Sequence, residues 1–270
     1  MGEPKAKLLD MSRVPKVREG FYATNNQFQK AGPKGFIEVK VLENDKLYVR
    51  VDLPGVPDDA IRVRVDSVRQ KVVFFSGETV INKKEGVREY SGTAGLGCDC
   101  CEITGVDHVK MKDGVLRMIL SRVKVNKDDQ QNNNNKCTLT VPPFTGQSGI
   151  RLEDHPYIVK GRKDALFWAP MEVEGGCLFA VDLPGACGED DVEVSANENT
   201  VSFKAEIKNV CENDESARTY LGSMKSPYGS SDQPLNTTHT IGWDVRFGVL
   251  MIVVIPHGNT TTTNNNNEYA

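Results

Sequence analysis

The stretch that decides the fold is Val51-Asp52-Leu53-Pro54-Gly55, which returns later in the chain as Val181-Asp182-Leu183-Pro184-Gly185. In each copy an alternating apolar run ends in a Pro-Gly pair, which is typical of a strand that runs into a turn. A second landmark, Arg88-Glu89-Tyr90-Ser91-Gly92-Thr93, is echoed by Arg218-Thr219-Tyr220-Leu221-Gly222-Ser223. Both pairs are separated by the same offset of 130 positions, from 51 to 181 and from 88 to 218. The chain therefore contains an internal repeat.

A third pair of landmarks, Gly114-Val115-Leu116 and Gly248-Val249-Leu250, follows in the same order. Between the copies lies the polar tract of residues 126–136, and a similar tract, 260–267, follows the second copy. Such low-complexity segments cannot bury a core, so both are predicted to lie outside the folded domains. The predicted organisation is a mostly disordered polar arm (1–35), a first domain (36–126), an Asn-rich flexible linker (127–164), a second domain (165–257) and a disordered Thr/Asn-rich tail (258–270).

Within each copy the apolar residues recur with a period of two, which predicts strands rather than helices. Residues 249–255 are apolar on both faces, as expected of a strand in the middle of a sheet. Short strands without intervening amphipathic helices favour an antiparallel all-β sandwich in each copy. The alternating positions are Leu47, Val49, Val51 and Leu53, then Ile61, Val63 and Val65, then Val73 and Phe75, then Val109 and Met111, then Val192 and Val194, and finally Val201, Phe203 and Ala205.

A strand that ends in V-D-L-P-G, followed by G-V-L at the start of an apolar strand, resembles the α-crystallin domain of small heat-shock proteins. The spacing from Pro54 to Gly114 is 60 residues and that from Pro184 to Gly248 is 64. The resemblance implies two immunoglobulin-like antiparallel β-sandwiches of α-crystallin type in tandem, in a divergent, plant-type branch of the superfamily. It also implies a basic residue on the strand that faces a dimer partner.

For that basic residue the candidates are Arg88 and Arg218, which share one place in the repeat. Asp52 and Asp182 also share one place, directly before L-P-G, and we interpret them as strand ends that accept hydrogen bonds from turn amides. Gly114 and Gly248 are expected at a turn or a close approach where a side chain is poorly tolerated.

The resemblance further implies that polypeptide binds at exposed sheet edges and in apolar grooves, because an edge strand offers unpaired N–H and C=O groups to a guest strand. The same alternation also fits side chains of the inner core, and the sequence leaves that alternative open. The candidate residues are Ile61, Arg62, Val63, Arg64, Val65, Val109 and Met111 in the first copy, and Val192, Val194, Trp243 and Val245 in the second.

Two functions fit such a binding protein. One is an ATP-independent chaperone that holds unfolded clients, and the other is an adaptor or scaffold with specific partners, as the resemblance implies for some members in nuclear DNA demethylation complexes. Arg62 and Arg64 on one strand, against Asp190, Asp191 and Glu193 on its counterpart, also predict self-association through complementary sheet edges.

Composition narrows the remaining classes. A net charge of −4 gives no basic footprint for nucleic acid or for an anionic membrane. No apolar run reaches the length of a membrane span, and the first residues lack the core of a signal peptide, so a cytoplasmic or nuclear protein is expected. No phosphate-loop or nucleophile-elbow motif occurs, so we expect neither an enzyme nor a cofactor.

The cysteines of the stretch 98–101 define a function of another class, a metal or redox sensor. Cys98, Cys100 and Cys101 are weak candidates for a metal site, because zinc is usually held by two separated pairs of ligands and no second pair follows. Reversible oxidation and inert or partly buried thiols are the other interpretations.

Overall fold

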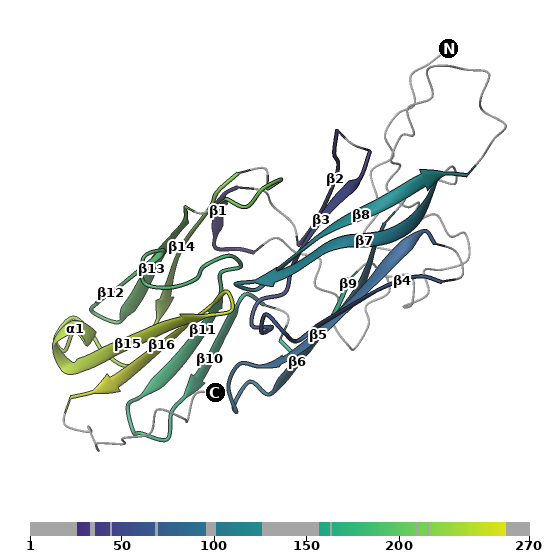
Figure 1. The fold of residues 1–270 in the computed structure, drawn as a ribbon. Coiled ribbons are helices and arrows are strands. Elements are labelled where there is room, and N and C mark those ends of the chain that lie inside the picture. Colours follow the sequence, from purple (N-terminus) through teal and green to yellow (C-terminus); the bar gives the residue numbers. More distant parts are fainter. Residues whose placement is uncertain are drawn as a thin grey trace, which may run out of the picture.

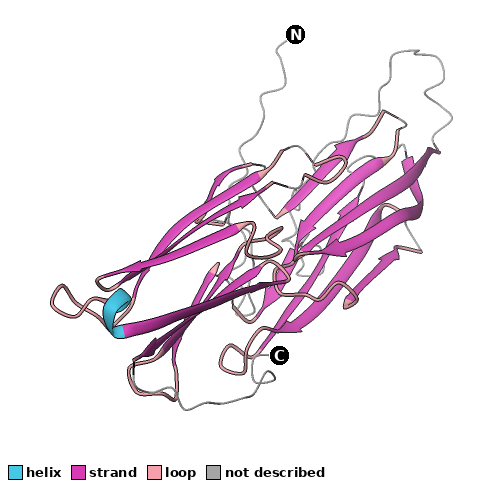
Figure 2. Cartoon of the chain, turned by 60° about the vertical axis from the view of Figure 1, so that its left-hand side comes forward, coloured by secondary structure: helices cyan, strands magenta, loops and turns pink. Residues whose placement is uncertain are grey.

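We describe a computed structural model of the chain over residues 26–32, 36–43, 45–67, 70–95, 101–125, 157–162, 164–208, 210–214 and 216–257. Figure 2 shows that nearly every element in this part of the chain is a strand, with one short helix at one end. The strands form four antiparallel sheets of four strands each. The prediction of an all-β chain is therefore confirmed. None of the helices described is long and apolar enough to cross a membrane.

Two of the sheets enclose the core of the first unit, which we define by strands β2 to β9. The first has the order β2-β3-β8-β7 and the second the order β4-β5-β6-β9. Their bounds are β2 (Ile37–Val41), β3 (Leu47–Asp52), β4 (Ile61–Val65), β5 (Val72–Val80), β6 (Val87–Gly95), β7 (Cys101–Lys112), β8 (Val115–Lys124) and β9 (Tyr157–Lys160).

The other two sheets enclose the core of the second unit, with the orders β10-β11-β16-β15 and β1-β14-β13-β12. The short helix α1 (Leu235–Thr238) precedes the last two strands. The strand bounds are β1 (Gln29–Ala31), β10 (Leu166–Pro170), β11 (Cys177–Asp182), β12 (Val192–Asn197), β13 (Thr200–Ile207), β14 (Arg218–Lys225), β15 (His239–Arg246) and β16 (Val249–Pro256).

The period-two side chains form the two cores. Leu47, Phe75 and Leu116 meet in the first core, and Phe203 and Leu250 occupy the second. These side chains come from both sheets of a unit, so the apolar face of each sheet is buried against the other. The runs predicted as strands are strands, and the apolar run of residues 249–255 lies in β16, in the interior of its sheet.

Each unit receives one edge strand from the segment that precedes the other unit. β1 pairs with β14 of the second unit, and β9 pairs with β6 of the first. Figure 1 shows β1, at the start of the described chain, lying beside β14. Phe28, next to β1, is buried with its ring 5.2 Å from that of Phe203. Two stretches predicted as a mostly disordered arm and a flexible linker thus contain strands, because pairing across the units supplies hydrogen bonds that such short segments lack alone.

The core assignment can be tested with Leu116→Ala and Leu250→Ala. Both leucines are fully buried, so each change should lower the free energy of unfolding of its unit by roughly 2–5 kcal/mol through lost burial and a residual cavity. Val123→Ala, at a site that is 47% exposed in β8, is the control and should cost far less. Urea unfolding measures all three, and a neutral leucine variant would show that the strand register is wrong.

Candidate binding surfaces and the interface between the units

Two buried ion pairs join the units reciprocally. Arg88 Nη1 of β6 lies 3.0 Å from Asp182 Oδ2 of the second unit, and Arg218 Nη1 of β14 lies 2.9 Å from Asp52 Oδ2 of the first. All four residues are buried. The interpretation of these aspartates as acceptors for turn amides is therefore wrong for Asp182, whose carboxylate binds Arg88 and Arg162 instead. For Asp52 the same interpretation misses the main partner, Arg218. A carboxylate that is buried beside a guanidinium keeps its charge paired, whereas either group buried alone would cost several kcal/mol.

Further groups hold the first pair in place. Arg162, after β9, also binds Asp182, and Glu85 Oε1 lies 2.5 Å from Arg88 Nη2. Burial raises the pKa of Asp182, and the neighbouring Arg88 and Arg162 oppose that rise. Burial by itself would lower the pKa of Arg88, but the carboxylates of Asp182 and Glu85 raise it above its ordinary value. The cluster contains two arginines and two carboxylates, so its formal charges balance.

A tyrosine two residues after each arginine links the interface to the V-D-L-P-G turn. The Tyr90 hydroxyl donates to the Pro54 carbonyl at 2.7 Å, and the Tyr220 hydroxyl donates to that of Pro184 at 2.9 Å. Burial raises the pKa of both hydroxyls, that of Tyr220 to about 12. Both tyrosines therefore remain neutral donors at physiological pH, which fixes each turn against the strand that carries the arginine.

The repeated turns themselves meet across the interface. The Gly55 amide donates to the Phe247 carbonyl and the Gly185 amide to the Asp113 carbonyl, both at 2.8 Å. Gly114 and Gly248 have φ values of +71° and +70°, and a Cβ on either would collide with a carbonyl of the other unit. The prediction that these two glycines sit at a turn and a close approach is confirmed.

A polar contact covers the outer face of the first unit. Asp214 of the second unit lies 2.8 Å from Arg117 Nη2 of β8, and its carboxylate also accepts a hydrogen bond from the Tyr48 hydroxyl. Burial by itself would raise the pKa of Asp214, but the bonds from Arg117 and Tyr48 hold it below its usual range. Together with the arginine pairs, this contact explains why β3 is buried on both faces.

The predicted binding residues of the first unit lie on two edge strands, β4 and β7. Ile61, Val63 and Val65 are half-buried against the core. Arg62 and Arg64 are exposed, as the alternation predicts, and the Arg64 guanidinium lies 4.3 Å from the centre of the Phe74 ring. On β7, Met111 is a core residue, whereas Val109 is 46% exposed. The edge therefore combines open backbone with a partly accessible apolar row.

The corresponding residues of the second unit are more enclosed. Val192 on β12 and Val245 on β15 are buried in the core, while Val194 and Trp243 are half-buried against it. Helix α1 contacts both edge strands. Its fully buried Leu235 donates its amide to the Glu198 carbonyl at 2.6 Å, which closes one end of this edge.

Of the three candidate sensor cysteines, Cys98 and Cys100 lie outside the described residues. Cys101 is fully buried in the first core, where its side chain packs with apolar neighbours. Over the described ranges, no group of three His, Cys, Asp or Glu side chains could hold a metal ion. Cys187 is exposed, but its hydrogen bond to Asp191 raises its pKa to about 11, which keeps it protonated. The Asp191 contact thus disfavours a reactive thiolate at Cys187.

The sequence interpretation missed the reciprocal pairing, although its signal was present. Asp52 and Asp182 occupy one repeat position, and Arg88 and Arg218 occupy another. A carboxylate and a guanidinium that are duplicated together can pair within each copy or between the copies, and the sequence does not decide which. The period of two could not show this, because it does not state which face of β3 or β11 meets the other unit.

The buried pairs should matter more than exposed ones. Asp182→Ala leaves Arg88 and Arg162 without their shared carboxylate, so the free energy of unfolding should fall by about 3–5 kcal/mol. Glu206→Ala, which removes an exposed pair with Lys204, is the control and should cause no measurable change. Guanidinium unfolding measures both. Equal stability of the two variants would contradict the assignment of Asp182 to the interface.

Acid should weaken the Asp214 contact. Because its folded pKa lies below the unfolded value of about 3.9, Asp214 contributes stability that is fully present above that pH and is lost as the pH falls through the folded pKa. Asp214→Asn should therefore be less stable than the parent chain near neutral pH, and the difference should shrink below about pH 4. Urea unfolding across this pH range checks it, and a constant difference would refute the lowered pKa.

Two comparisons relate the chain to known proteins. The "Putative 57 kDa heat shock protein" of Arabidopsis thaliana is 42% identical over 116 residues, which are 42% of this chain and 21% of that protein. The matched part thus spans about a fifth of that relative's length. The family described as "Predicted plant small heat shock protein" matches residues 8–257, nearly the whole chain. The chain therefore belongs to this family of plant small heat-shock proteins.

Proposed function

We propose that this protein is an ATP-independent, chaperone-like protein-binding module, built from two α-crystallin-like sandwiches in tandem, that binds polypeptide through sheet edges. The observation that carries the proposal is the set of edge strands that remain open in the described chain. One sheet edge of the first unit is occupied by β9, and one sheet edge of the second unit is occupied by β1. The strands β4, β7, β12 and β15 have one ladder partner each.

An open edge can add a guest strand through its unpaired N–H and C=O groups. On β4 the half-buried Ile61, Val63 and Val65 offer apolar contact, and the exposed Arg62 and Arg64 discourage indiscriminate pairing. The first unit is the better docking surface, because α1 closes one end of the corresponding edge in the second. This supports binding of a polypeptide rather than a small molecule.

Charge also supports self-association between copies. On β4, Arg62 and Arg64 are exposed and face outward. On β12, Glu193 is exposed, as is Asp190 two residues before that strand. Asp191, also predicted for this edge, is buried and accepts hydrogen bonds from Cys187, so the proposal does not use it. Complementary edges of this kind set the rate and choice of partner more than the total affinity.

The chaperone activity can be tested on a client that aggregates on heating, without ATP. The chain should suppress client light scattering, and Val109→Asp should weaken suppression several-fold because it places a charge on the open β7 edge. Val123→Asp, at a comparably exposed site on β8, is the matched control and should keep suppression. The double variant Cys98→Ser/Cys100→Ser should also remain active.

If the parent chain suppresses no aggregation, the chaperone proposal fails. Affinity purification at normal and raised temperature then decides between a dedicated adaptor, which keeps a short and stable partner list, and a protein without such partners. Loss of partners in the double cysteine variant would instead favour the sensor.

A further inference from the structure

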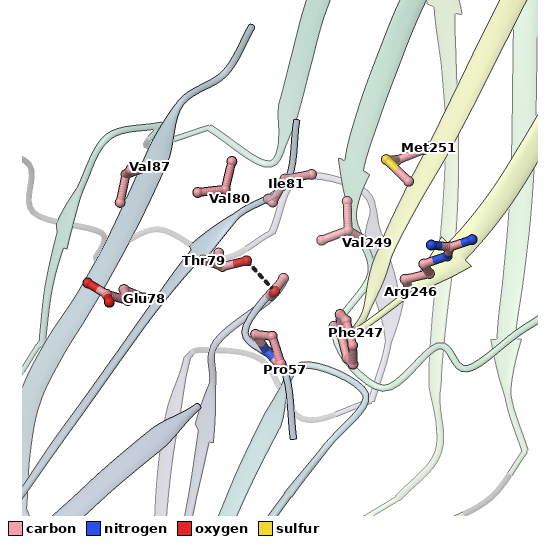
Figure 3. Close-up of a pocket in the computed structure, with 11 residues that line it drawn as sticks. Pro57, Glu78, Thr79, Val80, Ile81, Val87, Arg246, Phe247, Val249 and Met251 are labelled. Carbon is pink, nitrogen blue, oxygen red and sulfur yellow. Dashed lines mark hydrogen bonds between the residues drawn. The ribbon is translucent and has the colours of Figure 1, made fainter. Parts of the chain in front are cut away.

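A groove of about 500 Å³ lies between the two units, away from the β4 and β7 edge. Figure 3 shows the ends of β5 and β6 on one side and the β15–β16 turn on the other. Its size falls within the range of pockets that bind ligands in proteins. The residues that matter for recognition are Glu78, Val80, Ile81, Val87, Phe247 and Met251.

The floor of the groove is apolar and fixed. Ile81 of the first unit packs with Val249 and Met251 of the second in a buried cluster. The Thr79 hydroxyl donates to the Gly55 carbonyl at 2.5 Å, which ties the end of β5 to the turn after β3. Because both units build it, the groove depends on the ion-paired interface and is preformed by it.

The rim carries large apolar side chains that reach solvent. Val80 is 54% exposed, Val87 55% and Phe247 39%. Three such side chains around one hollow differ from the scattered apolar residues of an ordinary surface, and grouped apolar exposure marks binding sites. A guest that covered them would remove apolar area from water.

Charge at the rim selects the guest. Glu78 is exposed, and no described residue forms an ion pair with it. Arg246, across the groove in Figure 3, is already paired with Asp244 at 2.6 Å. The uncompensated charge is therefore negative, which favours a guest with a basic group at the Glu78 side.

The repeat provides an internal comparison. In the strand register Glu78 corresponds to Glu206 and Val80 to Lys208, because Glu78 lies opposite Glu89 and Glu206 lies opposite Thr219. Met251 of β16 corresponds to Arg117 of β8, by the offset of 134 that also relates the two G-V-L motifs. At that second position Arg117 is held by Asp214 of the other unit, so a polar contact occupies the place of the apolar floor. Duplication alone would give two similar grooves, but in the described chain the side chains make this one apolar and place a polar contact at its counterpart.

We propose that this inter-unit groove binds an aliphatic segment of a partner polypeptide that places a basic side chain beside Glu78. The inference rests on the proposed function for the nature of the partner, a polypeptide, but it uses a surface separate from the sheet edges. Recognition occurs through side chains on the apolar floor and through one charge at the rim.

The test uses the full-length chain and two short fluorescent peptides of leucine and valine, one ending in lysine and the other in aspartate. The parent chain should bind the lysine peptide more tightly. Val80→Ser/Val87→Ser should weaken that binding roughly tenfold or more, because the apolar rim is lost. Val123→Ser/Val210→Ser, which changes exposed valines outside the groove, is the matched control and should bind as the parent does. Glu78→Lys should reverse the preference between the peptides.

Equal losses in the two double variants, unchanged preference in Glu78→Lys, or no binding by the parent chain would each overturn the inference. The aggregation assay separates this result from the proposed function. Suppression that depends on Val109 but not on Val80 and Val87 keeps the function and removes the groove as its site. Groove-dependent peptide binding without any suppression keeps the groove and removes the chaperone proposal.

Discussion

The carboxylates at the ends of β3 and β11 each take a close charge partner from the opposite unit. Asp52 and Asp182 are both buried, and each meets an arginine that the other unit supplies. A carboxylate that leaves water without a cation costs several kcal/mol, whereas a paired one costs far less. Such a pair contributes little net stability, but it penalises every arrangement in which the units slide or separate. The position of one unit against the other follows from this constraint.

The other contacts across the interface add to that position. The reciprocal turn bonds of Gly55 and Gly185 require the close approach that Gly114 and Gly248 permit. β1, which precedes the first unit in the chain, then extends a sheet of the second unit. β9, which precedes the second unit, extends a sheet of the first. A short strand alone gains too few hydrogen bonds to offset its ordering, so these two form only because the units are already held side by side.

The two units differ in the outer sheet face and in the sheet edge that each presents. On the first, the outer face of the sheet is polar and is covered by Asp214, and the β4 and β7 edge remains open. On the second, the outer face is apolar and forms the floor of the inter-unit groove, while α1 narrows the edge. The turn bonds and ion pairs of the interface are thus repeated in both units, whereas the side chains of the outer faces differ between them. The divergence separates an edge suited to strand addition from a groove suited to side chains.

The period of two and the repeated V-D-L-P-G and G-V-L motifs determined the all-β class and most of the strands, because side-chain alternation and turn residues act within a few positions of the chain. They also located core residues such as Leu116 and Leu250. They did not reveal that Asp182 meets Arg88, that β1 joins β14, or that Met111 and Val245 are buried while Val109 is open. Those outcomes depend on which faces two folded units bury against each other. Only the tertiary structure decided them, since burial and ion pairing between distant segments leave no local period in the sequence.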